Sequence, residues 1–355
     1  MNKLIYIGHL IMGQNDGGMS RNKAFYDYFV KKDAQIYNLY DANLFKRAIQ
    51  LILFFYRSFF LKGNTVFLHM GTIFNIFPKV ILRNKLGYYC FVKYIKRLCK
   101  RNIFYIEIND LPFEQAKDLG LKLEVFYEDF QKTIFNCDLG INYIFASYEM
   151  EKYVLKKYNI KKEYSQVIIN GAPRLTPGIT SVDLDSYTDY SSKYVYVGTL
   201  AEGRGVDELL TLFKNSSSYL FLIGINGEWL KSRLTNFNNI IYLGSFDEAE
   251  TMRIVTKCDY GLIHYDSSKF YYNLCYPTKN SFYIASGVNV VCTRLLETRN
   301  VIFKYNIFLF EDIDKWQQII DNPSQYFNGL SKIDEDIKSK FYWDNILDNL
   351  VINKN

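Results

Sequence analysis

The chain alternates short apolar runs with longer amphipathic segments. In the first half the runs are rich in β-branched and aromatic residues, and they cover 3–10, 64–70, 102–108, 138–147 and 165–171. The segments between them, such as 19–31 and 148–158, have a helical pattern. Uninterrupted apolar strands separated by helices are typical of a parallel sheet that is covered on both faces.

The same alternation starts again after a polar break. Residues 170–192 hold two Pro, two Gly and many Ser, Thr and Asp, which is typical of a linker. Further strands are predicted at 193–200, 219–225, 239–246, 260–265 and 289–295, and further helices at 206–215 and 248–258. The pattern therefore predicts an α/β protein with two doubly wound Rossmann-like domains facing a central cleft, with ligands at the carboxyl ends of the strands.

Length and composition agree with this organisation. A chain of 355 residues suggests two domains, and 49% apolar with 23% charged residues is ordinary for a soluble protein. No apolar run reaches 18 residues, and the first run is too short for a signal peptide. The six cysteines are scattered without C-x-x-C spacing, which predicts free thiols in a reducing cytoplasm.

The charge is distributed unevenly. Residues 1–110 contain 17 Lys and Arg against 6 Asp and Glu, whereas residues 111–355 contain 26 against 31. Residues 42–106 alone hold 12 basic residues and no acidic one. A field of one sign on this scale indicates an anionic partner, which can be nucleic acid, acidic lipid or a phosphorylated substrate.

Two basic segments are also apolar. Residues 44–63 and 93–101 combine Lys and Arg with Phe, Leu and Ile, a composition typical of an interfacial helix on an anionic membrane. The alternative is a domain helix that is buried between solvated ends. Nucleic acid is disfavoured, because no known binding module is present and the second half is acidic.

A glycine-rich loop in "YVYVGTLAEGRGVDELL" (194–210) could hold an anion. A strand ends at Gly198, Gly203 and Gly205 flank Arg204, and a helix follows. Glycines let the backbone approach an anion, a helix start offers free N–H groups, and a guanidinium suits phosphate. The spacings of a dinucleotide fingerprint and of a P-loop are absent, which disfavours a dehydrogenase or epimerase. The alternative is a structural loop with a surface arginine.

A lysine in "CYPTKNSFYIASGVNVV" (275–291) stands at a predicted helix start. The helix dipole disfavours cations at that end, so the position of Lys279 indicates a function. The alternative is an exposed surface lysine without a specific role. If Arg204 and Lys279 converge, they form a two-cation clamp that stabilises a diphosphate leaving group without a metal.

Several stretches together resemble the GT-B glycosyltransferases of the family 4 type. "VIINGAPRL" resembles their V-I-x-N-G-V junction, "YVGTLAEGRGVDELL" their Y-V-G-R-L-x-x-x-K-G-x-x-x-L-L segment, and "YPTKNSFYIASGVNVV" their P-x-K-L-x-x-Y-L-A-S-G-x-P-V-V segment. "FYWDNI" (341–346) resembles the helix that crosses back to their first domain. The resemblance covers nearly the whole chain from about residue 100 and is closest in style to bacterial glucosyl- and galactofuranosyl-type transferases of surface glycans and adhesins.

The resemblance implies an acceptor domain at 1–172, a nucleotide-sugar domain at 173–340 and a returning helix at 341–355. It implies a hexosyltransferase that is metal-independent and retaining, needs no cofactor and uses a nucleoside-diphosphate sugar, with a UDP-sugar favoured. The acceptor would be a glycan, a glycoprotein or a polyprenyl-diphosphate-linked sugar, in bacterial surface glycoconjugate synthesis. A cytoplasmic location, peripheral membrane contact and a homo-oligomer belong to this expectation. The alternative is a non-catalytic nucleotide-sugar-binding accessory subunit.

Site residues carry over with departures. The catalytic set is Arg204, Lys279, Asn109 and Asp110, where Asn109 replaces the histidine of the family's H-D pair. The donor-binding set is Gly198, Thr199, Gly203, Gly244, Ser245, Phe246, His264, Tyr276, Pro277, Thr278 and Ser281. The acceptor and phosphate loop after the first strand is Asp16, Gly17 and Gly18.

The family's E-x7-E pattern is missing. Its glutamates would fall at Leu274 and Phe282, and the second normally holds the ribose. Ribose recognition is therefore expected from Ser281 or from backbone groups. His9 and His69, at strand ends, are interpreted as structural histidines.

Overall fold

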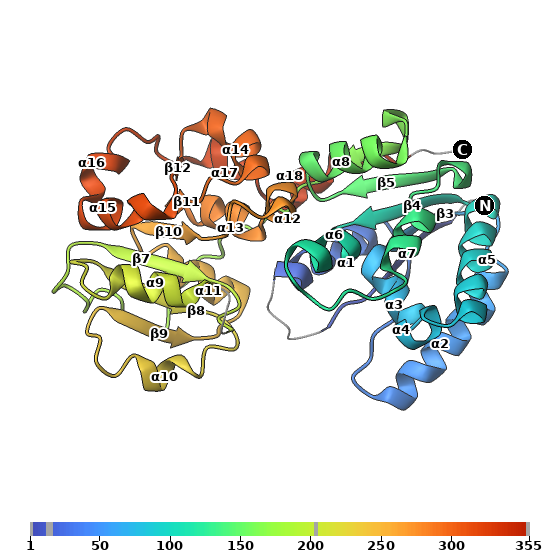
Figure 1. Cartoon of the computed structure of the whole chain (residues 1–355), viewed down its shortest axis with the longest axis horizontal. Coiled ribbons are helices and arrows are strands. Elements are labelled where there is room, and N and C mark those ends of the chain that lie inside the picture. The colour runs from blue at the N-terminus through green and yellow to red at the C-terminus, as the bar shows by residue number, and fades with distance from the viewer. Residues whose placement is uncertain (1–2, 12–16, 202–204, 353–355) are drawn as a thin grey trace.

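Two lobes, each built on a six-stranded parallel sheet between helices, make up the molecule (Figure 1). The computed structural model describes residues 3–11, 17–201 and 205–352. Both chain ends lie at the outer side of the first lobe (Figure 1).

The first sheet has the strand order β2-β1-β3-β4-β5-β6. Its strands are β1 (Leu4–Gly8), β2 (Gln35–Asn38), β3 (Thr65–His69), β4 (Ile103–Ile108), β5 (Ile141–Phe145) and β6 (Ser165–Val167). The chain winds in opposite directions from β1 and from β3, so the switch point, where ligands bind in such sheets, lies between these strands.

The second sheet has the order β12-β11-β10-β7-β8-β9. Its strands are β7 (Lys193–Val197), β8 (Tyr219–Ile223), β9 (Ile240–Gly244), β10 (Tyr260–Ile263), β11 (Asn289–Cys292) and β12 (Phe308–Phe310). This is the strand order of a dinucleotide-binding Rossmann sheet, with its switch point between β7 and β10.

Helices cover both faces of both sheets. Those of the first half are α1 (Gly17–Lys31), α2 (Leu44–Phe59), α3 (Ile73–Ile76), α4 (Lys79–Leu82), α5 (Lys85–Arg101), α6 (Pro112–Asp118), α7 (Tyr127–Ile134) and α8 (Tyr148–Tyr158). Those of the second half are α9 (Val206–Phe213), α10 (Leu230–Arg233), α11 (Glu248–Val255), α12 (Phe270–Leu274), α13 (Thr278–Ser286), α14 (Leu296–Ile302), α15 (Trp316–Asp321), α16 (Pro323–Phe327), α17 (Glu335–Ser339) and α18 (Trp343–Leu347).

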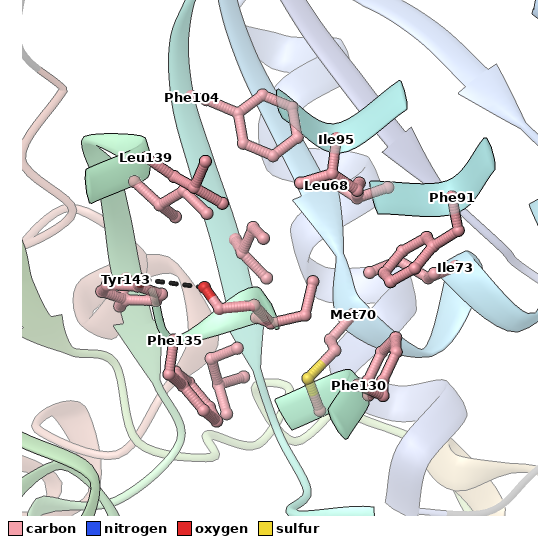
Figure 2. Packing of buried hydrophobic residues seen from close by; sticks show 14 of the residues in the cluster. Leu68, Met70, Ile73, Phe91, Ile95, Phe104, Phe130, Phe135, Leu139 and Tyr143 are labelled. Carbon is pink, nitrogen blue, oxygen red and sulfur yellow. Dashed lines mark hydrogen bonds between the residues drawn. The ribbon is translucent and has the colours of Figure 1, made fainter. Parts of the chain in front are cut away.

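Burial on both faces explains why the strands read as unbroken apolar runs. In β1, Ile5 and Ile7 point into a core shared with α2 and α5, whereas Tyr6 points into a second core shared with α1 and α18. Successive side chains of a strand alternate between faces, so a strand covered on both sides needs apolar residues at every position. Figure 2 shows part of the larger core, where the Tyr143 hydroxyl donates to the Ile134 carbonyl at 2.9 Å. The phenol therefore keeps a hydrogen bond while its ring is buried.

The chain crosses between the lobes twice, at adjacent places. The Ala172 N–H donates to the Phe341 carbonyl, and the Trp343 N–H donates to the Ala172 carbonyl, both at 2.9 Å. Gly171 makes room for this arrangement, because a Cβ there would lie 2.8 Å from the Trp343 ring. Beyond the crossing, α18 packs into the core of the first lobe.

Most of the predicted linker belongs to the second lobe. Leu184 is buried in the core of that lobe, with Val182 and Tyr187 packed against it. Glu250 accepts hydrogen bonds from the Thr180 and Ser181 hydroxyls at 2.9 and 2.7 Å. The polar composition reflects irregular structure on a surface rather than a free connection.

A second contact between the lobes is made by α12 and α14. Tyr271 and Leu274 of α12 are buried in the core of the first lobe. The Glu297 carboxylate of α14 accepts the N–H groups of Tyr148 and Glu149 at 2.8 Å each, at the start of α8. Ser147, the residue before α8, makes no side-chain capping bond of its own. One lobe therefore caps a helix of the other.

Within the described residues, every helix falls short of the length and apolar character that a membrane crossing requires.

The pH dependence of stability should reflect Glu297. Burial raises the pKa of this carboxyl to about 7, although the two N–H groups of α8 lower it. A raised native pKa means that the favourable contribution of Glu297 is complete below its ordinary value of 4.5 and is lost as pH rises through about 7. The loss is at most about 3 kcal/mol, at about 1.4 kcal/mol per unit. We expect the free energy of unfolding of the wild type, measured in urea, to fall relative to that of Glu297→Gln as pH rises from 4.5 to about 7.

The matched control is Glu163→Gln, which changes an exposed carboxylate. A stability difference between wild type and Glu297→Gln that is constant across this pH range would contradict the assignment.

Candidate functional site

Both switch points open into one cavity of about 1330 Å³ between the lobes. The first lobe contributes the last residue of β2 and residues that follow β1 and β4, and the second contributes residues that follow β7, β8 and β10. Parallel strands place their carboxyl ends on one edge, so residues far apart in sequence meet here.

Lys279 lies on the wall formed by the second lobe. It is the second residue of α13, whose start is fixed by Pro277. Its Nζ lies 3.8 Å from the centroid of the Tyr196 ring and 5.2 Å from that of Tyr265. No carboxylate of the described residues lies within ion-pair distance of it. Burial lowers the pKa of Lys279, but the hydroxyls of Tyr196, Tyr265 and Tyr283 raise it, with a net increase, so the ammonium stays charged.

Gly198, at the end of β7, leaves the space that Lys279 fills. Its φ is +150°, and a Cβ there would lie 2.8 Å from Lys279 Cε and 3.1 Å from Nζ. At the end of β8, a Cβ on Gly224 would lie 1.7 Å from the Gly198 carbonyl oxygen. Two adjacent strand ends thus require glycine for the lysine to reach the cavity.

His264, the residue after β10, is held against the start of α9. Its Nε2 lies 2.8 Å from Glu208 Oε2, and a Cβ on Gly205 would lie 2.6 Å from its Nδ1. Burial lowers the pKa of His264; Glu208 raises it and Lys279 lowers it further, and the net shift is downward. The imidazole is therefore neutral near pH 7 and donates a hydrogen bond to Glu208. Lys279, and not His264, carries the positive charge at this wall of the cavity.

Asp110, after β4, faces the cavity from the first lobe. Its Oδ1 accepts a hydrogen bond from the Tyr271 hydroxyl of α12 at 2.6 Å. Burial raises the pKa of Asp110, while the Tyr271 hydrogen bond lowers it, with a net increase. Asn109 lines the cavity beside it. The bond between Asp110 and Tyr271 joins the lobes at the cavity floor.

A buried arginine connects the first lobe to the loop that carries Lys279. The Arg21 Nε donates to Glu107 Oε1 at 2.6 Å, and its NH1 donates to the Asn170 side-chain oxygen at 3.1 Å. The Asn170 amide nitrogen donates to the Tyr276 carbonyl at 2.6 Å. Arg21, through Asn170, therefore fixes the backbone three residues before Lys279.

The lobes also meet across the cavity at two helix starts. The Ser20 hydroxyl of α1 donates to Glu248 Oε1 of α11 at 2.7 Å. Burial raises the pKa of the Glu248 carboxyl, while the Ser20 hydrogen bond lowers it. This contact limits the opening of the cavity on that side.

Most of the predicted site residues that the structure describes line this cavity. They are Gly18, Asn109, Asp110, Gly198, Thr199, Ser245, Phe246, His264, Tyr276, Pro277, Thr278 and Lys279. Gly17 is the first residue of α1. Asp16, Gly203 and Arg204 lie outside the described residues, so the clamp of Arg204 with Lys279 stays a prediction.

Two predicted residues are not brought to the cavity. The Ser281 hydroxyl is fully buried and donates to the Asn170 carbonyl, so the structure does not bring it to the cavity, and its binding of a ribose stays a prediction. Gly244 does not line the cavity either; its φ of +102° turns the chain so that Ser245 and Phe246 reach it.

The sequence did not single out Arg21, Asn170 or Glu208. Arg21 is one basic residue in an ordinary helical pattern, and its burial follows only from the tertiary fold. Asn170 stood inside the Asn-Gly junction, whose resemblance to a known motif was the one signal that could have identified it.

Among the described residues, no group of three or more His, Cys, Asp or Glu side chains is placed to hold a metal ion. All six cysteines are free thiols.

Comparisons with known proteins identify the fold. No protein-family model and no curated protein sequence matches the chain. Sucrose-phosphate synthase from Thermosynechococcus elongatus superposes with a TM-score of 0.65 over 97% of this chain and 96% of that chain, at 11% identity. HepE from Anabaena, in complex with UDP-glucose, gives a TM-score of 0.61 over 96% of each chain at 12% identity. WaaG, a glycosyltransferase involved in lipopolysaccharide biosynthesis, gives 0.57 over 97% of this chain and 94% of that chain at 9% identity.

These likenesses, together with the two doubly wound sheets, show that the chain has the GT-B fold. The predicted fold class is confirmed. Assignment to family 4 stays a prediction.

Removing the Tyr271 hydroxyl should weaken the joint between the lobes. In Tyr271→Phe the Asp110 carboxylate would stay buried without this donor, at a cost of about 1–3 kcal/mol. The cost should be larger above the pKa of Asp110 than below it, because a charged carboxylate loses more when its donor is removed. Urea unfolding at acidic and at neutral pH measures this.

Tyr89→Phe, at an exposed position, is the control. Equal stability losses in the two variants would show that the hydrogen bond does not hold the lobes together.

Proposed function

We propose that the chain is a glycosyltransferase that moves a hexose from a nucleoside-diphosphate sugar, with a UDP-sugar as the favoured donor. The observation that carries this proposal is Lys279, a charged ammonium at the switch point of a Rossmann-type sheet with no carboxylate partner among the described residues. Two neighbouring helix starts, those of α9 and α13, offer N–H groups at the same wall. HepE, which shares the fold, is seen with UDP-glucose.

The proposed chemistry uses Lys279 to stabilise the leaving diphosphate. As the bond between the sugar and the diphosphate breaks, negative charge grows on the phosphate oxygen, and an ammonium already in place stabilises it without reorganisation. Among the described residues, Lys279 makes no ion pair with a carboxylate. A phosphate would therefore not have to displace one. Arg204 is the proposed second cation. In this mechanism the two side chains supply the charge that a metal ion supplies in other transferases.

The base and ribose fall on the turn after β9 and on nearby backbone groups. Ser245 and Phe246 line the cavity and are proposed to contact the base. Phe282 lines the cavity at the position where the resemblance would place a ribose-binding glutamate. We therefore assign the ribose hydroxyls to backbone groups of this wall rather than to an acidic side chain.

The acceptor is proposed to enter from the first lobe. Lys23, Tyr26, Asp27 and Asn38 line this side of the cavity and provide hydrogen-bond partners for sugar hydroxyls. The proposed acceptor is a glycan, glycoprotein or lipid-linked sugar of a bacterial surface glycoconjugate, made in the cytoplasm; the fold is shared with WaaG of lipopolysaccharide biosynthesis.

We propose transfer with retention of the anomeric configuration. Asp110 already accepts a hydrogen bond from Tyr271, and Asn109 has no basic group. In the proposed mechanism the departing phosphate takes the acceptor proton. Proton NMR of the product gives the anomeric configuration directly.

The second candidate is a nucleotide-sugar-binding accessory subunit without transfer activity. The phenylalanine at position 282 favours it, because it removes the usual ribose ligand. Incubation with radiolabelled UDP-sugars separates the two candidates: transfer or slow hydrolysis supports the enzyme, and binding without either supports the accessory subunit.

Substitution of Lys279 should remove turnover and preserve the fold. We expect Lys279→Ala to lower kcat about a hundredfold or more, as loss of a transition-state charge partner does. Radiolabelled sugar transfer measures kcat, and addition of EDTA should leave the wild-type rate unchanged. Lys231→Ala, at an exposed position, is the control. A Lys279→Ala rate within a few-fold of wild type would remove the lysine from the mechanism.

A methyl group at Gly198 should displace Lys279. Gly198→Ala places a Cβ 2.8 Å from Lys279 Cε at a backbone angle that alanine rarely adopts, so UDP affinity should fall about tenfold. Isothermal titration with UDP measures this. In Gly329→Ala the new methyl group meets nothing within 4 Å, and affinity should be unchanged. Equal affinities in both variants would show that Lys279 does not need this space.

A further inference from the structure

Helix α2 is apolar on two opposite faces, and the described protein covers one of them. The inner face, centred on Phe54 and Phe55, packs edge-on against the aromatic rings of Tyr37, Phe77 and Tyr94. A helix that is apolar all round is expected to be buried all round. The opposite face of α2 therefore calls for an explanation.

The outer face of α2 is a continuous apolar strip open to solvent. It consists of Phe45, Ile49, Ile52, Leu53, Tyr56, Phe59 and Phe60. The spacing from Phe45 to Ile49, Ile52 and Tyr56 follows the helical repeat, so these side chains lie along one side. Their exposed fractions run from 43% for Ile49 to 74% for Phe45. Exposed apolar residues are ordinary singly, but a strip of this length marks an interaction surface.

Basic residues border the outer face of α2 on both sides. Lys46 and Arg57 follow one border along α2 itself. On the other border, α5 contributes Arg97, whose guanidinium lies 3.7 Å from the centroid of the Phe59 ring, and Arg101, which donates to the Phe59 carbonyl at 3.3 Å. Figure 1 shows α2 and α5 together on the side of the first lobe away from the second.

In the part of the chain that the structure describes, these cations have no acidic partners. No Asp or Glu occurs anywhere between residues 42 and 106. Among the described residues, Lys46, Arg57, Arg97 and Arg101 form no ion pair. The surface thus presents an apolar centre with a rim of one sign, and its partner must supply apolar material and negative charge together.

We infer that the outer face of α2, with its basic rim, docks onto a lipid bilayer that contains anionic lipids. The apolar side chains enter the boundary between headgroups and acyl chains, and the rim cations meet lipid phosphates. Tyr56 and the three phenylalanines suit this depth, because aromatic rings are favoured at the membrane interface. α2 has 16 residues, about 24 Å, and its inner face is held by the protein, so it lies in the plane of the membrane surface.

A second copy of the chain fits this surface less well. A symmetric dimer through this face would place basic rim against basic rim, with no carboxylate from residues 42–106 to pair them. Nucleic acid would match the rim but not the aliphatic centre formed by Ile49, Ile52 and Leu53.

The docked orientation would bring the membrane close to the cavity. Asn38, the last residue of β2, lines the cavity, and α2 starts six positions later at Leu44. At most about 20 Å of extended chain therefore separates Asn38, on the side of the cavity assigned to the acceptor, from the start of α2. This consequence rests on the proposed function, because it lets a lipid-anchored acceptor reach the cavity; the docking itself does not rest on it.

Flotation with vesicles tests the docking without any donor or acceptor. The full chain is mixed with vesicles of phosphatidylcholine alone or of phosphatidylcholine with phosphatidylglycerol. We expect the chain to float with the anionic vesicles and to bind the neutral vesicles at least about tenfold more weakly. Binding to the anionic vesicles should fall as the salt concentration is raised. Failure to float with anionic vesicles overturns the inference.

Variants separate the apolar strip from the rim. Phe45→Ser, Ile52→Ser and Tyr56→Ser combined should reduce binding about tenfold or more, because three exposed anchors are removed. Lys46→Gln with Arg57→Gln should reduce binding to anionic vesicles and leave binding to neutral ones unchanged. Ile179→Ser with Phe303→Ser, two exposed apolar residues elsewhere, is the matched control and should bind as wild type.

Circular dichroism and size-exclusion chromatography complete the test. All substituted side chains are exposed, so unfolding temperatures should match that of wild type. Unchanged vesicle binding in the triple serine variant overturns the inference. A second outcome also overturns it: the wild type is a dimer, the triple serine variant is a monomer, and neither binds vesicles. The strip would then be covered by a second copy of the chain.

Discussion

The position of Lys279 depends on one buried hydrogen-bonded chain, from Glu107 through Arg21 to Asn170. Glu107 Oε2 and Arg21 NH2 have no hydrogen-bond partner among the described residues, so this ion pair leaves polar atoms unpaired in the interior. Burial raises the pKa of Glu107, although Arg21 lowers it, which reflects the cost of enclosing the carboxylate. A buried ion pair of this kind is weak evidence for stability, whereas breaking it leaves an uncompensated charge. Its clear structural consequence here is positional: it fixes Asn170, and Asn170 fixes the loop before α13.

The first lobe also depends on segments from the second half of the chain. α18 follows the second sheet in the chain but completes a core of the first lobe, and α12 buries Tyr271 there as well. The start of α8, which is also in the first lobe, takes its cap from Glu297 of the second lobe. The first lobe therefore lacks part of its own packing when it is alone. Covalent crossings, packed aromatic rings and hydrogen bonds together hold the cavity between the lobes. Across its mouth, the Ser20 hydroxyl donates to Glu248.

The sequence predicted most strands well, because a strand that is buried on both faces has an unbroken run of apolar residues. It missed β2 and β12, which have four and three residues and lie at sheet edges, where a short strand leaves little pattern. Lys279 was singled out because a cation at a helix start conflicts with the local rule, and the structure places it in the cavity wall. Arg21 was not, because it obeys the local rules of α1 and its partners are 86 and 149 residues away. Spacing placed Ser281 on α13 without saying which side of that helix faces the cavity, and the structure buries its hydroxyl.

The cavity and the outer face of α2 both present unpaired cations, yet their surroundings give them different physics. Lys279 lies between tyrosine rings in an enclosed site, where the effective dielectric is low and salt screens little, so its attraction for a phosphate is short-ranged and specific. The rim cations of α2 and α5 are exposed, so each contributes little alone, and their attraction extends over about 10 Å at moderate salt and weakens as salt rises. Enclosure therefore suits the first cation to one defined anion, and exposure suits the second group to a broad anionic surface. The exposed group contains four of the 12 basic residues between 42 and 106, whereas the single lysine of the cavity belongs to the acidic half of the chain.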